Sequence, residues 1–181
     1  MKSISKIIPH LIFVTMLAVS SVAMSTDRND SEAARIIQAM ELYAQATPMD
    51  QQSPKRTELL NQAEGILTAV IKQNPESLDA HRKLMGVYLQ KRDYRNAILT
   101  MQGAISLSPE DPKLYIALAI LYDHQGAYEY ALPILEQALD LDANNKLAQD
   151  YKVNIQQKIE QQRLAMESSP SPHKMDAAHS R

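Results

Sequence analysis

The chain has 181 residues, and 19 Lys and Arg against 21 Asp and Glu give it a net charge of −2. It contains no Cys, which excludes disulfide scaffolds, zinc ribbons, iron–sulfur sites and thiol catalysis. The near-neutral charge argues against nucleic acid as a partner, because nucleic-acid-binding proteins are usually clearly basic. The chain has only four Gly, and this low glycine content disfavours Gly-rich phosphate loops and turn-rich β folds.

The first 23 residues have the pattern of a secretory signal peptide. Two lysines precede an apolar run from Ile7 to Val19, and small residues at Ser21 and Ala23 suit a signal peptidase. We expect cleavage after Ala23, with Ser25 as the second choice, and a flexible start over 24–30. The protein should then be exported, with the periplasm as the expected compartment. The alternative is a retained N-terminal membrane anchor facing the periplasm, although the run is short for a span of about 20 residues.

Residues recur at an interval of 34 through the middle of the chain. The pairs 34 apart include Leu84 and Leu118, Tyr88 and Tyr122, Ala97 and Ala131, and Ala104 and Ala138. This period is typical of the tetratricopeptide repeat (TPR), a helix–turn–helix unit. The chain resembles the TPR family from about residue 31 to 162, with nearly complete repeats over 78–111 and 112–145.

The resemblance implies an all-α fold, a TPR superhelix (solenoid) of about three helix pairs with a C-terminal capping helix. A degenerate repeat is expected over 31–77. Tyr43 and Ala63 are 20 residues apart there, whereas the equivalent residues of the regular repeats are 9 apart. We interpret the extra residues as an enlarged loop over 46–54.

Capping signals and the C-terminal segment complete the predicted fold. Ser53 and Asp111 each precede a proline, and Asp93 precedes a helical pattern, so these side chains should cap helix N-termini. Apolar residues four apart on one face predict a capping helix over 146–163. The tail over 167–181 lacks periodicity and should be disordered.

No arrangement of residues indicates an enzyme, a metal site or a bound cofactor. Asp123 and His124 are neighbours in the sequence, so on a helix their side chains point about 100° apart and do not form a catalytic pair by spacing. No recognisable motif places a serine nucleophile beside them. We expect a non-enzymatic protein with no cofactor and no metal, because the family that the chain resembles mostly provides recognition surfaces.

The resemblance also implies a concave groove lined by the first helix of each repeat. The family's groove positions carry over to a set of partner-binding residues: Asp79, Arg82, Lys83, Gly86, Leu89, Gln90, Lys113, Ile116, Ala117, Ile120, Asp123 and His124. We expect Ile116 and Ile120 to be apolar positions open to a ligand. The alternative is that the N-terminal helix or the enlarged loop packs over them.

The groove does not match the TPR domains that clamp a C-terminal carboxylate pair, which use Lys, Asn and Arg at fixed positions. Arg82 and Lys113 could each hold one carboxylate. The expected Asn positions hold Gly86 and Ile120, however, and Ala117 replaces an Arg. We therefore expect a helix or an extended apolar segment as the ligand.

Charge is unevenly distributed, with +3 over 77–106 and −6 over 107–145. This polarity could steer an acidic partner or permit head-to-tail association. The leading hypothesis is an adaptor or scaffold of the cell envelope that holds a segment of an exported or membrane-associated protein, as an assembly or maturation factor. The alternative is a structural subunit that forms homo-oligomers through its oppositely charged repeats.

Overall fold

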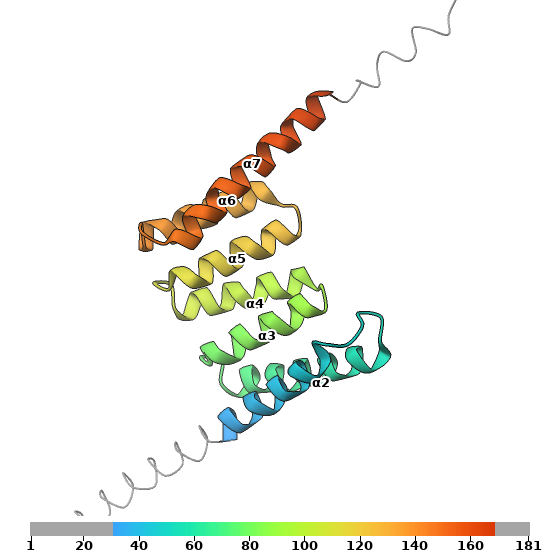
Figure 1. Cartoon of the computed structure of the whole chain (residues 1–181). Helices are drawn as coiled ribbons and strands as arrows, with labels where there is room; N and C mark the ends of the chain where they lie inside the picture. Colours follow the sequence, from blue (N-terminus) through green and yellow to red (C-terminus); the bar gives the residue numbers. More distant parts are fainter. Residues whose placement is uncertain (1–30, 169–181) are drawn as a thin grey trace, which may run out of the picture. The chain divides into compact units, whose positions relative to one another are not determined.

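The computed structural model describes residues 31–168 (Figure 1). These residues form seven helices and no strand, which confirms the predicted all-α TPR superhelix. The predicted signal peptide, the start over 24–30 and the predicted tail from residue 169 onward lie outside the described residues. None of the helices within 31–168 has the length and apolar character to cross a membrane.

The chain divides into two compact units, with the boundary between Lys83 and Leu84, inside α3. In its described part, the first unit comprises a helix over 31–46, α2 (Pro54–Gln73) and the beginning of α3 (Leu78–Gln90). The second unit comprises the rest of α3, α4 (Tyr94–Leu107), α5 (Pro112–His124), α6 (Tyr128–Leu141) and α7 (Lys146–Ser168).

The loop of the first helix pair lies within one residue of its predicted bounds, 46–54, at each end. The helix over 31–46 continues past Tyr43, and α2 begins at Pro54, so the loop covers 47–53. The Ser53 side chain caps α2 by accepting from the backbone N–H of Arg56, 3.4 Å away. Most of the extra residues therefore extend helices, because a cap and a proline at the first position start α2 early.

One face of each helix in the first pair forms the core of the first unit. The buried apolar residues on α2 follow a helical spacing: Leu59, Leu60, Ala63, Leu67 and Val70. The helix over 31–46 contributes Ile36, Ala39 and Ala46. The two helices lie side by side in Figure 1.

In the second unit, α4, α5, α6 and α7 pack in chain order, each against the next. The small side chains of the predicted period are fully buried at Ala97, Ala104, Ala131 and Ala138, which lets the helices approach closely. Ala148 and Ile155 join α7 to a core cluster with α5 and α6. The helix thus covers the last regular pair.

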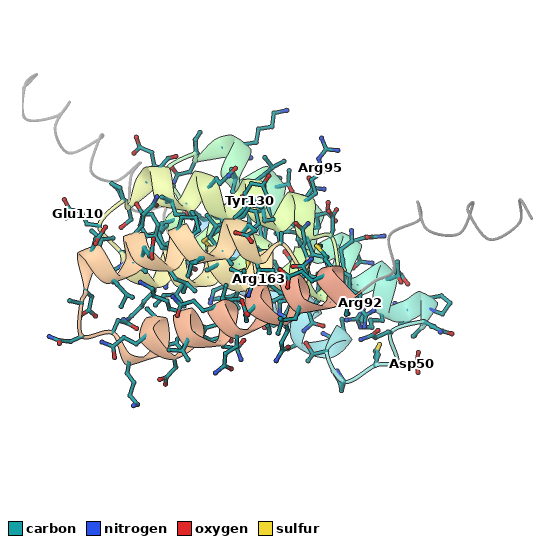
Figure 2. The ribbon with its side chains drawn as sticks, turned by 90° about the horizontal axis from the view of Figure 1, so that it is seen from above. Asp50, Arg92, Arg95, Glu110, Tyr130 and Arg163 are labelled. Atoms are coloured by element: carbon teal, nitrogen blue, oxygen red, sulfur yellow. The ribbon has the colours of Figure 1, made fainter. Side chains whose placement is uncertain are left out.

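α7 runs beyond its predicted end at residue 163. It ends at Ser168, so Glu167 and Ser168 are helical rather than part of the predicted tail. Arg163, labelled in Figure 2, pairs with Glu160 and Glu167 at 2.7 and 3.1 Å. Such pairs three and four residues apart support an exposed helix end, which is why helix continues where apolar periodicity has faded.

The two regular pairs turn through equivalent short connections. Arg92 (φ 58°) and Gly126 (φ 71°) lie 34 residues apart, and both adopt the left-handed conformation. In each turn the next backbone N–H donates to a tyrosine carbonyl, that of Tyr88 or of Tyr122, at 2.9 Å. This is a common way to end a helix, and it satisfies carbonyls that the helix leaves open.

Candidate partner-binding surface

The predicted groove residues divide between the two units. Arg82 and Lys83 belong to the first unit. In that unit Asp79 lines a hollow of about 330 Å³ together with Ile36 and Ile37. The groove residues from Gly86 onward belong to the second unit. The candidate surface lies within the second unit.

Ile116 is not an open groove position, contrary to the sequence analysis. Its side chain is 3% exposed and belongs to a buried cluster with Leu135 of α6 and Ile155 of α7. Ile120 is partly buried and packs against the same cluster. The cluster that buries these residues is built with α6 and α7, not with the N-terminal helix or the loop that we expected as alternatives.

The composition of α5 contains the signal for this burial. Leu114, Ile116, Leu118, Ala119 and Leu121 are all buried, and together they occupy several sides of the helix. A helix that is apolar all round is typically enclosed by its neighbours. The sequence analysis did not predict this burial, because the family's groove positions assign one face of α5 to a ligand.

Asp123 and His124 contact different helices. The Asp123 carboxylate accepts a hydrogen bond from Lys158 Nζ of α7 at 2.5 Å, and the same ammonium group lies 5.5 Å from the centre of the Tyr128 ring. The His124 ring stacks on Tyr94 of α4, with 5.8 Å between ring centres. The two side chains therefore serve separate contacts instead of one shared catalytic arrangement.

A hollow of about 350 Å³ lies where α7 passes the end of α5. Its lining residues are Asp123, Leu147, Asp150, Tyr151, Asn154 and Lys158. Of these, only Asp123 was predicted as a binding residue. The other five all come from α7, and each lies 34 residues after a predicted groove position of α5: Lys113, Ile116, Ala117, Ile120 and His124. The sequence analysis missed them because it treated 146–163 as a cap and did not continue the groove pattern into it.

The hollow offers apolar and polar groups close together. Leu147 is 53% exposed, Tyr151 is half-buried, and the Asp150 and Asn154 side chains are exposed. Within residues 31–168, no group of three or more His, Asp or Glu side chains is arranged to hold a metal ion. A surface of this kind can bind the side chains of a peptide.

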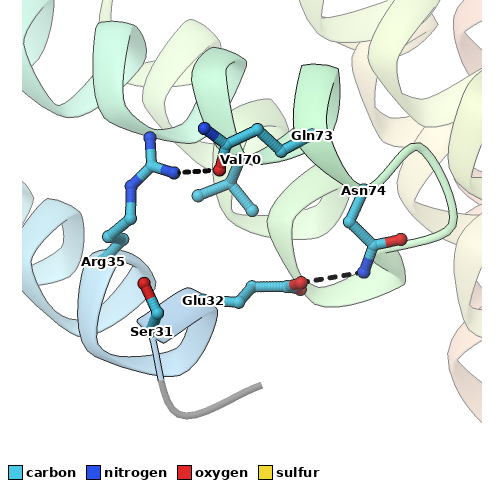
Figure 3. Close-up of a pocket in the computed structure, with 6 residues that line it drawn as sticks. All are labelled: Ser31, Glu32, Arg35, Val70, Gln73 and Asn74. Atoms are coloured by element: carbon cyan, nitrogen blue, oxygen red, sulfur yellow. Dashed lines mark hydrogen bonds between the residues drawn. The ribbon is translucent and has the colours of Figure 1, made fainter. Parts of the chain in front are cut away.

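A second hollow, of about 250 Å³, lies in the first unit (Figure 3). Here Glu32 accepts hydrogen bonds from the Asn74 amide at 2.8 Å and from the Ser77 hydroxyl at 2.5 Å. These bonds lower the pKa of the Glu32 carboxyl, with Ser77 as the larger cause. Arg35 donates to Gln73 at 2.5 Å. The polar groups of this hollow bind each other, so it is a structural connection between the helices.

Comparison with protein families matches two regions to tetratricopeptide-repeat models, residues 57–112 and 88–152. Together they span 57–152, more than half of the chain. One curated relative is the formate-dependent nitrite reductase complex subunit NrfG of Escherichia coli O157:H7. It is 31% identical over 77 residues, a match that covers 41% of this chain and 39% of NrfG.

Several solved TPR structures have a similar fold. The TPR protein TTC0263 of Thermus thermophilus matches with a TM-score of 0.61 and 20% identity, covering 75% of this chain and 68% of that one. The Arabidopsis OM64 TPR domain matches with a TM-score of 0.55 and 16% identity, and the match covers 71% of this chain and 96% of that domain. The second TPR domain of human RPAP3 was solved with an HSP70 peptide. It matches with a TM-score of 0.50 and 18% identity, and the match covers 67% of this chain and 98% of that domain. The repeat period, the paired helices and these matches show that the chain belongs to the tetratricopeptide-repeat family.

Proposed function

We propose that the protein is a non-enzymatic adaptor that holds a segment of a partner protein in the hollow between α5 and α7. The observation that carries this proposal is the exposed side chain of Leu147 beside the half-buried ring of Tyr151, both at groove positions of the repeat. TPR proteins generally act as protein-binding scaffolds, and the human RPAP3 domain named above was solved with a bound peptide. Exposed apolar groups rimmed by polar ones are typical of such surfaces.

The bound segment is not expected to be a chaperone C-terminus. Gly86, Ala117 and Ile120 stand where a carboxylate clamp needs Asn and Arg. The partial burial of Ile120 in the core cluster gives a second reason, because that side chain is held by α5–α7 packing. An extended or helical segment with apolar side chains suits Leu147 and Tyr151 better.

The cell envelope is the proposed place of action. The charged start, apolar run and small residues of the first 23 positions support export. NrfG is a subunit of a formate-dependent nitrite reductase complex, and the partial match to it supports a role as a partner of an enzyme complex. Fractionation of the cells followed by N-terminal sequencing tests the export step. A mature chain beginning at Met24 in the envelope is expected, and an intact chain in the cytosol would contradict it.

A photocrosslinking experiment in the cell that makes the protein tests the binding surface. A photoreactive phenylalanine derivative replaces Leu147 in the hollow or, as the matched control, Leu99 on α4. Both leucines are exposed, at 53% and 55%, so both variants should fold. We expect one discrete adduct from position 147 and none from position 99, with mass spectrometry identifying the crosslinked segment.

The same experiment can refute the proposal. An adduct from position 99 alone would place the interaction away from the hollow. Equal adducts from both positions would indicate non-selective capture. Saturable competition by a synthetic copy of the crosslinked segment is the further requirement for a specific site.

A further inference from the structure

The charges that line the hollow do not all remain available to a ligand. Asp123 and Lys158 are paired at 2.5 Å, and their side chains are only 16% and 33% exposed. Lys158 also lies over the Tyr128 ring. A partly buried, doubly engaged ammonium group is costly to separate from its carboxylate. These two charges therefore largely cancel within the wall of the hollow.

Asp150 carries the remaining charge. Its side chain is exposed on the lining of the hollow, and no ion pair or hydrogen bond of that side chain is found among residues 31–168. Leu147 and Asn154 lie three residues before and four residues after it, so the three side chains share one stripe of α7. A carboxylate thus stands directly beside an exposed leucine.

The surroundings of the hollow reinforce this negative charge. Residues 107–145, which include α5 and α6, carry −6, and α7 with four Lys or Arg and three Asp or Glu carries +1, so the surroundings remain negative. Lys152, another cation of α7, is occupied by Glu136 of α6 at 3.0 Å. The summed field of such a surface attracts cations and repels anions over about a Debye length, roughly 8–10 Å at ordinary salt.

We propose that the segment held in this hollow is a basic–apolar one, in which a Lys or Arg pairs with Asp150 and a neighbouring apolar side chain packs on Leu147 and Tyr151. The inference rests on the proposed adaptor function and specifies the class of its ligand. Within the lining of the hollow, an acidic segment would meet Asp150 and no available cation, because the one lining cation, Lys158, is engaged with Asp123. Charge complementarity therefore selects one sign of ligand.

Peptide titration of the purified full chain tests this selectivity. Two fluorescent probe peptides of equal length are used, one built from Lys, Leu and Ser and the other from Glu, Leu and Ser, with binding followed by fluorescence anisotropy. We expect saturable binding of the Lys peptide and at least about tenfold weaker binding of the Glu peptide. Asp150→Asn should weaken binding of the Lys peptide by about three- to tenfold, more than a fully exposed ion pair usually contributes and less than a close, desolvated interfacial pair. Leu147→Ser should cause a similar loss by removing apolar contact.

Glu110→Gln is the matched control, because it removes the same charge from an exposed position outside the hollow (Figure 2). This variant should bind the Lys peptide within about twofold of the unchanged protein, since surface substitutions away from the contact have small effects. Circular dichroism should show equal helix content in all three variants. Equal weakening by Asp150→Asn and Glu110→Gln would overturn the inference, because binding would then reflect net charge alone. Failure of the Lys peptide to bind, or equal binding of both peptides, would also overturn it.

The crosslinking experiment separates this failure from failure of the adaptor function. A discrete adduct from position 147 that maps to an acidic segment would retain the adaptor and refute its basic–apolar ligand. Absence of an adduct from position 147 together with absence of Lys-peptide binding would refute both.

Discussion

The two regular repeats, 78–111 and 112–145, have matching backbones but different side-chain environments. Their helices have 13 and 14 residues in both cases, and their turns are equivalent. Arg82 is nevertheless exposed, whereas Ile116 at the equivalent position is 3% exposed. The repeat period thus sets where helices begin and end, while the neighbours of each helix set which side chains are buried. Exchanging residues between equivalent positions tests this distinction.

The largest effect is expected for Ile116→Arg, which gives the second repeat the residue of the first. It places a charge inside the cluster of α5, α6 and α7, and we expect a loss of about 3 kcal/mol or more in the free energy of unfolding. Urea denaturation followed by circular dichroism measures it. The reciprocal change, Arg82→Ile, should alter stability by less than about 0.5 kcal/mol. A loss below about 1 kcal/mol for Ile116→Arg would mean that this position is open, as the groove pattern first predicted.

The left-handed turn residues should respond in opposite directions. Arg92→Gly should stabilise the protein by about 1 kcal/mol, and Gly126→Ala should destabilise it by a similar amount, because a side chain is disfavoured at positive φ. A Cβ added at Gly126 meets no atom within 4 Å, so the cost comes from the backbone conformation alone. Thermal melting provides the measurement. Gly65→Ala is the control. A Cβ at this helical glycine also meets no atom within 4 Å, so the substitution should raise the stability of the protein, because Ala favours a helix more than Gly does. The same sign for Gly126→Ala and Gly65→Ala would contradict the account.

The N-cap positions of α4 and α6 are equivalent in the repeat but hold different residues. Asp93 accepts a hydrogen bond from the backbone N–H of Asn96 at 3.1 Å, whereas Ala127 has no side chain that can cap. The backbone angles are similar, at φ −87° and ψ 71° against φ −89° and ψ 58°. We expect Ala127→Asp to add about 0.5–1 kcal/mol of stability and Asp93→Ala to remove a similar amount. Urea denaturation curves of the two single variants and of the double variant measure both changes in the free energy of unfolding. Destabilisation by Ala127→Asp would show that the two turns are less equivalent than their angles indicate.

The smallest effect is expected in the first helix pair, which departs from the 34-residue period. Side-chain hydrogen bonds of Glu32 to Asn74 and Ser77 connect its two helices. Glu32→Gln should lower stability at pH 7 by a few tenths of a kcal/mol, because its bonds lie near the surface. The pKa of Glu32 is lowered in the folded state, so its contribution is complete above the ordinary carboxyl range and is lost as the pH falls through the folded-state value. Melting curves of protein and variant should therefore differ most at pH 7, and the difference should shrink as the pH is lowered below the ordinary carboxyl range. Glu41→Gln, exposed on the same helix, is the control, and an equal effect there would contradict the role of the Glu32 bonds.

Much of the fold could be predicted from local chemistry. Ser53, Asp93 and Asp111 cap the helices that follow them, as the sequence indicates. Capping depends on atoms within a few residues of each other, so local sequence is sufficient to predict it. The end of α7 was predicted less well. Helix ends depend on ion pairs such as those of Arg163 and on good helix-forming residues, which hydrophobic periodicity does not report.

The sequence alone determined the repeat, the all-α fold and the helix caps, because a 34-residue period and short-range hydrogen bonds are written in neighbouring residues. Only the tertiary structure decided which groove positions are buried and which are open. Ile116 and Asp150 occupy the same position of successive repeats, yet the first is buried and the second lines the hollow. The reason is that α6 and α7 together enclose Ile116 of α5, while no further described helix covers α7.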